Sequence, residues 1–566
     1  MDGMCADTLT MATVEGGMQA TAFDGLFGYL HRPAGAAFDT GVVIVAPLGR
    51  DARCAHTPMR LFADQLAAAG FPVLRYDHRG EGDSLPFGDP LGDASPMWRR
   101  DVRAAMAQLR AQTGVRRVVL AGARIGATFA ALAAEAADGL ILLAPVLNGR
   151  SWLRRMQFSA HCVKEAQAID FSGLHLAAAT VTGLSTLTVD CAGAPRRPIF
   201  VAAQNKLVRD CAVRLAADGA PVSVHDFPGF DALFEDAHSN LPPWEVFTAA
   251  HRWLEAQFAD HIPVAQPADA LDAVPAELRP AGAVERAITF GAGLHGVVCT
   301  PDRADPTRPA VVFCNTGGDP RAGIGGFAAA AARALAQRGT ASLRFDFRGL
   351  GDSAMADPAE RPHVYETPRE QDLDAALAAM GRLGHHGVLL VGICSGAYHA
   401  VRFAARDPRV EGVFAISPVK LVWRAGDSLV FGRRDDGKST ESYMQLLRNP
   451  ATWLRLLRGG IDLPVIARNL LGRLQVRLQT VKERLAGVSP LGGLRELSRR
   501  GGRAHFVMGT DDIALDEIGA WFGPRGARLT RLPGMTVAVD PRLDHGLARC
   551  QSRDIVLEQL VAWATG

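Results

Sequence analysis

Short apolar runs without polar interruption recur along the chain, separated by longer segments of helical character. The runs do not alternate apolar with polar residues, which is typical of parallel strands that are buried on both faces. They lie at 42–45, 118–122 and 140–145 in the first half, and at 310–314, 388–392 and 413–417 in the second. The pattern predicts an α/β fold with a mostly parallel sheet in each half.

The segments between these runs predict the helices that cover the sheets. "PMRLFADQLAAAG" (58–70) and "GFAAAAARALAQRG" (326–339) are rich in alanine, amphipathic, and end in glycine. Such helices connect successive parallel strands and pack on both faces of the sheet. We therefore expect a doubly wound α/β arrangement twice over.

The chain repeats itself at a nearly constant distance. "FPVLRYDHRGEGDS" (71–84) matches "ASLRFDFRGLGDS" (341–353), with Asp77 and Asp346 separated by 269 residues. Two further motif pairs, beginning near residues 41 and 118, have offsets of 269 and 270. A constant offset over three motifs indicates two copies of one fold. We expect a first domain at 1–259, a linker rich in alanine and proline at 260–284, and a second domain at 285–566.

Composition supports two domains and narrows the functional classes. A chain of 566 residues exceeds what one hydrophobic core normally organises. The net charge of +2 argues neither for nor against nucleic acid, and we expect no such partner. No run of 18 apolar residues occurs, so we expect no membrane span, and the first twenty residues do not resemble a secretory signal. The nine cysteines are dispersed without C-x-x-C pairs, which indicates reduced thiols in a cytoplasm, and we expect no metal and no cofactor.

Two segments share a glycine frame in which a strand turns sharply into a helix. "GICSG" (392–396) has Cys394 at its centre, and "GARIG" (122–126) has Arg124 there. A Cβ atom at the flanking positions would collide with the neighbouring strand and helix, so the turn needs glycine. The turn exposes the central side chain at a helix N-terminus, where the dipole favours a thiolate.

These motifs make both halves resemble α/β-hydrolase domains. The family's nucleophile elbow is Gly-x-Ser-x-Gly. "FDFRGLGDS" (345–353) is typical of its lipase- and aminopeptidase-like branches, and "NTGGDPRAGIGG" (315–326) resembles the glycine-rich loop of exosortase-associated bacterial hydrolases. Elbows with a central cysteine are known from dienelactone hydrolases and polyhydroxyalkanoate synthases. A dispersed buried cysteine is usually only a small hydrophobic residue, but the resemblance implies that Cys394 is a nucleophile.

The resemblance also implies the order nucleophile, acid, histidine. The acid usually follows the glycine of the next strand by three residues, which selects Asp512 over Asp511, and "RLDHGL" supplies His545. Asp544 competes as the acid, but an adjacent residue does not easily reach the far nitrogen of the ring. An oxyanion would then be received by the backbone N–H of Ser395 and by that of Thr316 or Gly317.

The first half lacks the same set of residues. Arg124 stands at the nucleophile position, Lys206 at the acid position, and His238 has nothing to activate. A guanidinium cannot attack a carbonyl, so we expect this copy to be catalytically inactive. Arg124 could bind an anionic group, or the copy could serve as a scaffold or partner surface.

A helical lid is expected at about 420–500, where α/β-hydrolases insert their cap. This range holds 13 Arg and 3 Lys against 7 acidic residues. A basic amphipathic lid suits an acyl group carried on coenzyme A, a carrier protein or a phospholipid. The other interpretation is an ordinary solvated helix face.

The sequence therefore predicts a cysteine acyl hydrolase or acyltransferase that acts on an ester or thioester through an acyl-thioester intermediate. A lactone hydrolase of dienelactone type is the alternative among enzymes, although a long lid fits a small lactone poorly, and a polyester synthase fits the duplicated chain less well. A non-catalytic binding or assembly module is the alternative outside enzymes. The sequence leaves the acceptor open.

Overall fold

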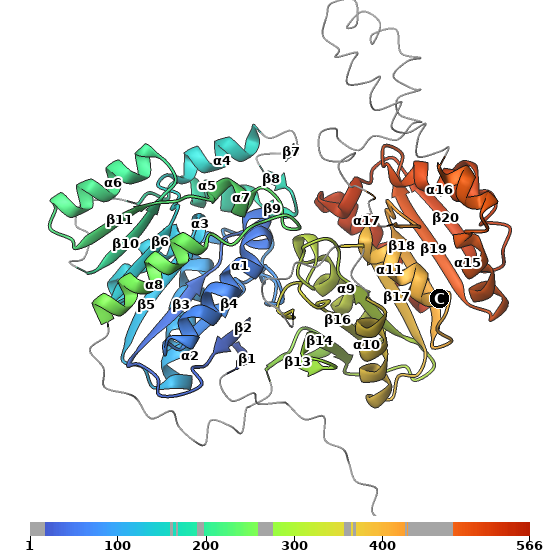
Figure 1. The fold of residues 1–566 in the computed structure, drawn as a ribbon, viewed down its shortest axis with the longest axis horizontal. Helices are drawn as coiled ribbons and strands as arrows, with labels where there is room; N and C mark the ends of the chain where they lie inside the picture. Colours follow the sequence, from blue (N-terminus) through green and yellow to red (C-terminus); the bar gives the residue numbers. More distant parts are fainter. Residues whose placement is uncertain are drawn as a thin grey trace, which may run out of the picture.

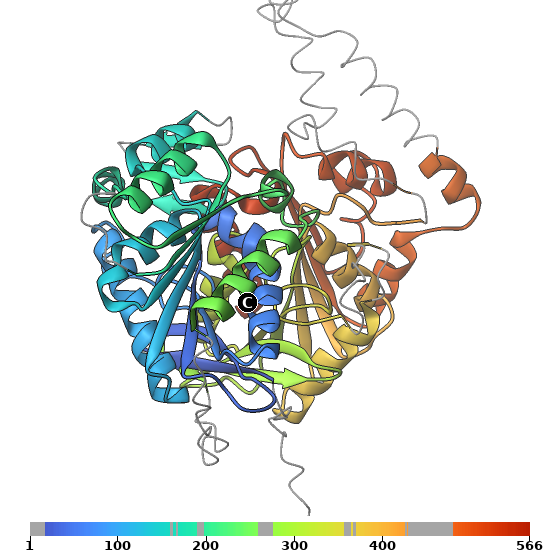
Figure 2. The same ribbon diagram turned by 60° about the vertical axis from the view of Figure 1, so that its left-hand side comes forward.

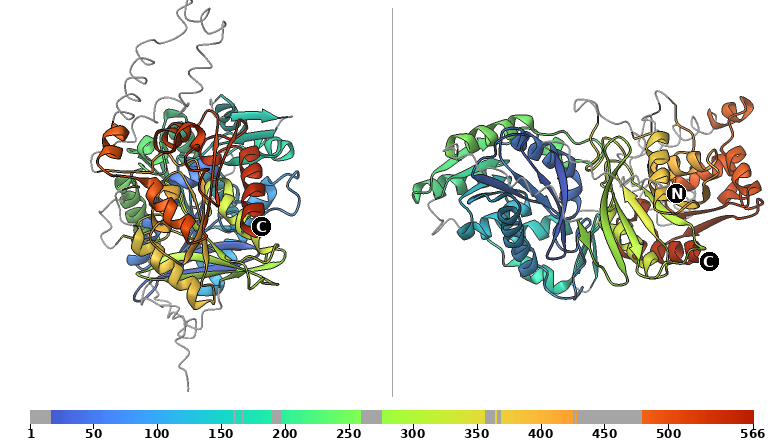
Figure 3. Two further views of the ribbon diagram at one scale, coloured as in Figure 1. Left: turned by 90° about the vertical axis from the view of Figure 1, so that its right-hand side faces the viewer. Right: turned by 90° about the horizontal axis from the view of Figure 1, so that it is seen from below.

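The structure is a computed structural model with two large sheets side by side (Figures 1 and 3). It describes residues 17–158, 168–189, 197–258, 276–355, 364–365, 369–424, 427 and 479–566, and the backbone of Cys162–Glu165. The N-terminal sheet has the strand order β1-β2-β4-β3-β5-β6-β10-β11. The C-terminal sheet has the order β12-β13-β14-β16-β15-β17-β18-β19-β20. Apart from the short β12, the second order repeats the first. In the first sheet all pairings from β4 to β11 are parallel, and in the second all pairings from β16 to β20 are parallel.

The N-terminal sheet is built by β1 (Met18–Phe23), β2 (Leu26–His31), β3 (Thr40–Val45), β4 (Val73–Tyr76), β5 (Arg117–Ala123), β6 (Gly139–Leu143), β10 (Ile199–Ala203) and β11 (Val222–Asp226). Its helices are α1 (Gly49–Ala68), α2 (Ser95–Thr113), α3 (Ile125–Leu132), η1 (Ala134–Ala136), α4 (Gly149–Gln157), α5 (Ala178–Ser185), α6 (Lys206–Ala217), α7 (Phe230–Phe234) and α8 (Trp244–Phe258). A small separate sheet consists of β7 (Cys162–Glu165), β8 (Ala168–Phe171) and β9 (Leu174–Leu176).

The C-terminal sheet is built by β12 (Glu277–Leu278), β13 (Ala283–Phe290), β14 (Leu294–Pro301), β15 (Ala310–Cys314), β16 (Ser342–Phe345), β17 (Val388–Ile393), β18 (Val410–Ile416), β19 (Arg503–Gly509) and β20 (Met535–Asp540). Its helices are η3 (Ile324–Gly326), α9 (Phe327–Ala336), α10 (Glu370–Arg382), α11 (Ser395–Ala404), α15 (Pro490–Arg499), α16 (Ala514–Phe522), η5 (Pro524–Gly526), η6 (His545–Leu547) and α17 (Cys550–Thr565).

Helices cover both faces of each sheet, so each sheet has two hydrophobic cores. In the N-terminal half, α2 and α3 contribute to one core, and α1 and α8 to the other. In the C-terminal half, α10, α11, α15 and α16 contribute to one, and α9 and α17 to the other. The predicted fold class, α/β with a mostly parallel sheet and helices on both faces, is confirmed. The apolar runs form fully buried strands such as β3 and β15 because both of their faces are covered.

Two ranges of the sequence prediction need comment. Of the expected linker, residues 260–275 lie outside the described residues, and 276–284 contain β12 and the start of β13. Most of the expected lid, 428–478, also lies outside them. The end of the lid range differs from the prediction, because α15 buries Leu494 and Leu497 in the core of the sheet and is part of the domain body. Its apolar positions therefore face the body rather than a substrate pocket.

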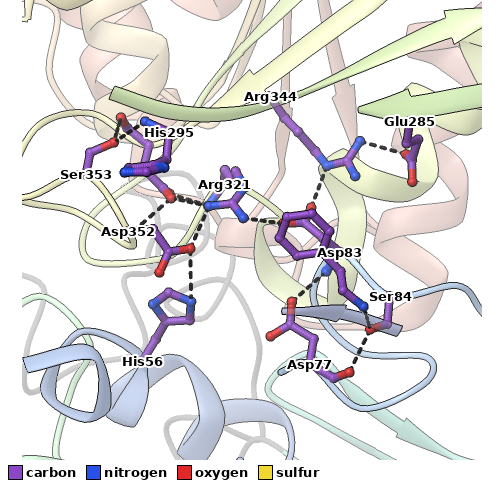
Figure 4. A network of polar contacts seen from close by, with 12 residues as sticks. His56, Asp77, Asp83, Ser84, Glu285, His295, Arg321, Arg344, Asp352 and Ser353 are labelled. Atoms are coloured by element: carbon purple, nitrogen blue, oxygen red, sulfur yellow. Dashed lines mark hydrogen bonds and ion pairs between the residues drawn. The ribbon is translucent and has the colours of Figure 1, made fainter. Parts of the chain in front are cut away.

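The two halves meet through a buried network of ion pairs (Figure 4). Arg75 of the first half pairs with Asp352 of the second at 2.8 Å, and Arg344 of the second pairs with Asp83 of the first at 2.6 Å. Arg75 and Arg344 are separated by 269 residues, and so are Asp83 and Asp352. Reciprocal contacts between equivalent residues are those of an interface with local two-fold symmetry.

Arg321 occupies the centre of this network. It pairs with both equivalent aspartates, Asp83 and Asp352, at 2.8 Å each, as Figure 4 shows. All three side chains are almost fully buried. Although burial raises the pKa of Asp83, the nearby Arg321 and Arg344 guanidinium groups outweigh it and lower that pKa. Buried charges are tolerated because each has an opposite partner.

Candidate active site

The predicted elbow around Cys394 is present in the structure. β17 ends at Ile393, Cys394 has φ 51° and ψ −111°, and α11 begins at Ser395. A Cβ on Gly392 would lie 2.3 Å from the carbonyl carbon of Gly396, and one on Gly396 would lie 2.5 Å from the carbonyl oxygen of Cys314. Only glycine fits at both positions, as the sequence pattern predicts. A non-glycine residue at such a φ is strained, and strain of this kind is found at functional sites.

Cys394, His545 and Asp512 come together at the carboxyl edge of the sheet. His545 Nδ1 lies 3.0 Å from Asp512 Oδ1. The imidazole also interacts with the Cys394 thiol, since each group shifts the pKa of the other. The Asp512 carboxylate is buried and accepts a second hydrogen bond from the Ala514 N–H at 2.9 Å. The three residues thus form a connected chain from a half-buried thiol through an imidazole to a buried carboxylate.

Charges within this chain shift its pKa values. Burial raises the pKa of Cys394, but the hydrogen bond and charge of His545 outweigh it, and the pKa of the thiol is lowered. Burial lowers the pKa of His545, but Asp512 outweighs it and holds that pKa well above its ordinary value. The pKa of Asp512 is lowered in spite of burial because the positive His545 ring faces it. The arrangement therefore favours a thiolate beside an imidazolium.

The two other candidates for the acid, Asp544 and Asp511, are placed differently from Asp512. Asp544 accepts hydrogen bonds from Ser552 Oγ and from the backbone N–H groups of Ala548 and Arg549. It therefore caps the turn that follows the histidine. Asp511 is exposed to solvent, whereas Asp512 is buried.

The loop after β15 is tied directly to the elbow. The Gly317 N–H donates to Ser395 Oγ at 2.9 Å, and Thr316 Oγ1 lies 3.5 Å from the same oxygen. Within the described part of the chain, the N–H groups of Thr316 and Ser395 find no acceptor. Of the two loop residues considered from the sequence, Thr316 is thus the one with a free backbone donor.

Tyr365 is a site residue that sequence reasoning missed. Its hydroxyl lies 3.6 Å from Cys394 Sγ. Its ring stacks on Trp423 at 4.6 Å and packs against the edge of Tyr398 at 5.1 Å. Burial, together with the Cys394 thiolate, raises the pKa of Tyr365 well above its ordinary value, so the phenol keeps its proton. No motif surrounds Tyr365, and only its position in space identifies it.

The first half has the same elbow with Arg124 at its centre. Arg124 has φ 55° and ψ −126°, and a Cβ on Gly126 would lie 2.4 Å from the carbonyl oxygen of Val45. Arg124 Nε donates to Asp51 Oδ2 at 3.2 Å. Lys206 is exposed at the first position of α6. This elbow therefore presents a paired guanidinium where the other presents a thiol.

His238 lies beside the loop of the other half that follows β15 and holds Thr316, Gly317 and Asp319. Because the sequence predicts an oxyanion donor in it, this loop is called the oxyanion loop. Its Nδ1 pairs with Asp236 at 2.8 Å. A Cβ on Gly318 would lie 2.0 Å from the carbonyl oxygen of Ala237 and 2.7 Å from the His238 nitrogen. The segment that carries the histidine thus packs against the second half.

Three more contacts from the first half support the candidate site. Arg53 Nη1 pairs with Asp319 of the oxyanion loop at 2.5 Å. The small sheet lies beside α17 (Figure 1), where Asp170 Oδ2 accepts from the Cys550 N–H at 2.6 Å and the Gly173 N–H donates to the Ala548 carbonyl at 2.8 Å. Figure 2 shows α1, which carries Arg53, between the two sheets. The loops that hold the oxyanion donors and His545 are therefore braced by the first half.

The part of the predicted lid that the structure describes is small. Arg473 and Arg477 lie outside the described residues. Arg484 lies over the ring of Trp521, 5.9 Å from its centroid. Val481 and Leu485, in the described part of the expected lid, are 51% and 83% exposed, so nothing in the described chain covers them. No described helix reaches the length and apolarity that a bilayer crossing requires.

A family model described as "Hydrolase_4: Serine aminopeptidase, S33" matches residues 53–181. The match lies within the first half of the chain. Est1E from Butyrivibrio proteoclasticus with bound ferulic acid is 16% identical, with 43% of this chain and 100% of that chain covered and a TM-score of 0.35. The esterase Pf2001 from Pyrococcus furiosus is 15% identical, with 50% and 93% covered and a TM-score of 0.29. A comparison with curated protein sequences finds no match.

Proposed function

We propose that the second half is a cysteine acyl hydrolase or acyltransferase that acts on an ester or thioester carbonyl. The observation that supports this proposal most is the position of Cys394 at the elbow, where its backbone is strained and its pKa is lowered. His545, hydrogen-bonded to Asp512, lies beside the thiol, an arrangement suited to nucleophilic catalysis.

In the first step the Cys394 thiolate attacks the acyl carbon and forms a tetrahedral intermediate. Its oxyanion is received by the backbone N–H groups of Ser395 and Thr316. The intermediate collapses to an acyl-thioester on Cys394, and His545 gives its proton to the departing alkoxide or thiolate. His545 then deprotonates water or another acceptor, which attacks the acyl-enzyme and releases Cys394. Asp512 holds the ring in the required orientation and stabilises its charge.

For the first half we propose a second copy of the same domain that no longer catalyses. Arg124 replaces the nucleophile, and its permanent charge cannot attack a carbonyl. Lys206 at the matching acid position is exposed and could not orient a histidine. The contacts of Arg53, Asp170 and Ala237 with the second half give this copy a structural role beside the candidate site.

The test is intact-mass analysis of the full chain after incubation with a panel of acyl N-acetylcysteamine thioesters. We expect one acyl mass, located on Cys394 by peptide mapping, and none on a folded Cys394→Ala protein. Cys550→Ala is the matched control, because burial raises the pKa of that thiol and it should not compete. Full turnover by folded Cys394→Ala would refute the mechanism and favour a non-catalytic module or another nucleophile.

The carrier of the acyl group is tested by ionic strength. If a basic lid recognises an anionic carrier such as coenzyme A or a carrier protein, kcat/KM should fall as the Debye length shrinks from about 30 Å to about 8 Å. A small neutral thioester should show no such fall. Equal salt dependence for both would leave a simple ester as the substrate and hydrolysis as the reaction.

A further inference from the structure

The first half contains a cavity of about 570 Å³ at its own elbow. Its lining residues include Arg124 at the centre of the elbow and residues of α4 and α7. Figure 1 shows both helices near the ends of the strands of this half. It therefore occupies, in the first half, the place that Cys394 and its partners occupy in the second. Cavities of this size and position hold small molecules in α/β proteins. Loss of the nucleophile has removed the chemistry from this place but has left the space.

Two arginines line the cavity, and only one of them has a carboxylate partner among the described residues. Arg124 Nε donates to Asp51, and its two terminal nitrogens donate to no residue in the described part of the chain. Arg155, which also lines the cavity, donates to none of the described residues. Burial lowers the pKa of Arg155, and the nearby Arg124 guanidinium lowers it further, so the two charges lie close enough to repel.

The complete lining of the cavity carries one more positive than negative charge, as do Arg124, Arg155 and Asp51 alone. Arg50 and Asp231 also line the cavity, and their charges cancel. One positive charge is thus in excess at the cavity, whose arginine without a partner among the described residues, Arg155, is exposed to solvent. A bound monoanion would neutralise it, whereas a phosphate dianion would leave an excess of negative charge.

The Arg124 guanidinium is held in a geometry suited to a carboxylate. Its centre lies 5.3 Å from the ring centroid of Phe230 and 5.8 Å from that of Phe234. The two rings hold the guanidinium in place, and its terminal N–H groups, which have no acceptor in the described part of the chain, suit a planar two-oxygen partner.

The remaining walls are mixed. The apolar side chains Trp152, Met156, Phe171, Leu174 and Phe227 line the cavity together with the amides Gln204 and Asn205. An inorganic anion would leave the apolar side chains against empty space or water, whereas a ligand with an aromatic or aliphatic body would cover them.

We propose that this cavity binds an organic monocarboxylate with an aromatic or acyl body, its carboxylate held by Arg124 and Arg155. The proposal does not depend on the chemistry proposed for Cys394. It gives the catalytically inactive half a ligand-binding function and explains why the elbow carries an arginine.

The test is isothermal titration of the full chain with 4-phenylbutyrate and with octanoate. The controls are the primary amides of both acids and inorganic phosphate. We expect one site per chain for the carboxylates and no measurable heat for the amides or for phosphate. Arg124→Met and Arg155→Met should each weaken carboxylate binding at least tenfold, because each removes charge-assisted hydrogen bonds. Lys206→Met is the matched control, since it removes an exposed charge near the cavity that does not line it, and its affinity should stay within twofold.

Carbamidomethylation of Cys394 distinguishes binding at the first-half cavity from binding at the elbow of the second half. Carboxylate binding should persist in the alkylated protein if the first-half cavity is the site. Binding that disappears on alkylation, equal binding of the amides or of phosphate, wild-type affinity in both arginine variants, or no binding at millimolar concentration would each overturn the proposal.

Discussion

The support that the first half gives to the oxyanion loop can be tested with one added methyl group. Gly318 lies two residues after Thr316, and a Cβ there would lie 2.0 Å from the Ala237 carbonyl oxygen and 2.7 Å from the His238 nitrogen. Both atoms are backbone, so they cannot turn aside as a flexible side chain would. In Gly318→Ala, either the loop or the Ala237 segment must therefore move.

The size of the movement follows from the contact distance. Moving a carbon from 2.0 Å to an acceptable distance of at least about 3 Å requires a shift of about 1 Å. A misplacement of about 1 Å can lower a catalytic rate by about 10²-fold, and loss of one oxyanion donor by about 10²- to 10³-fold. We therefore expect kcat of Gly318→Ala to fall by about 10²-fold, while KM changes little and the protein stays folded.

The assay measures the rate of Cys394 acylation by intact mass, together with steady-state kcat and KM for the same thioester. Gly381→Ala is the matched control, because it adds a methyl group within α10 where no atom lies within 4 Å. The reasoning is refuted if Gly318→Ala acylates at the wild-type rate, or if Gly381→Ala loses as much activity.

Three further perturbations test other parts of the structure. Tyr365→Phe removes a hydrogen bond that lowers the pKa of Cys394, so the pH profile of alkylation at Cys394, followed by peptide mass, should move to higher pH; an unchanged profile would remove Tyr365 from the site. Asp512→Asn should lower kcat by about 10⁴-fold with folding retained, because the histidine loses the group that fixes its tautomer. Arg344→Met leaves two buried carboxylates with fewer partners and should lower the free energy of unfolding in denaturant titration by about 3 kcal/mol, the lower end for a broken buried pair, since neighbouring arginines remain. The exposed Arg286→Met should change that free energy much less.

Features that depend on local sterics could be predicted from the sequence. The strands follow from unbroken apolar runs. The two elbows follow from glycine pairs such as Gly392 and Gly396, because the turn between them leaves no room for a side chain at either position. Asp512 and His545 could be chosen because the fold family places them after particular strands. Their hydrogen bond in the structure agrees with that choice, although their catalytic roles stay a prediction.

Features that depend on how distant segments meet could not be predicted. Tyr365 reaches Cys394 from a loop without any pattern. Ala237 meets Gly318 across the two halves, and Arg321 joins aspartates that are 269 residues apart in the sequence. Each of these contacts depends on how whole helices and strands are placed relative to one another, and a short stretch of sequence does not determine that placement. The sequence also could not decide between Thr316 and Gly317 as the oxyanion donor. Only the structure shows that the Gly317 N–H already donates to Ser395 Oγ.

The glycine frame in the first half shows why a motif alone does not identify a catalytic site. A Cβ on Gly122 would lie 2.6 Å from the Ala127 nitrogen, as close as the contacts around Gly392 in the second half. Both glycines of the frame are therefore required by packing of strand against helix, whatever side chain stands between them. Selection for folding alone would keep the frame after the nucleophile is lost. The chemistry must be read from the central side chain and its partners, which are a histidine and a buried carboxylate for Cys394, and a single aspartate and a charged cavity for Arg124.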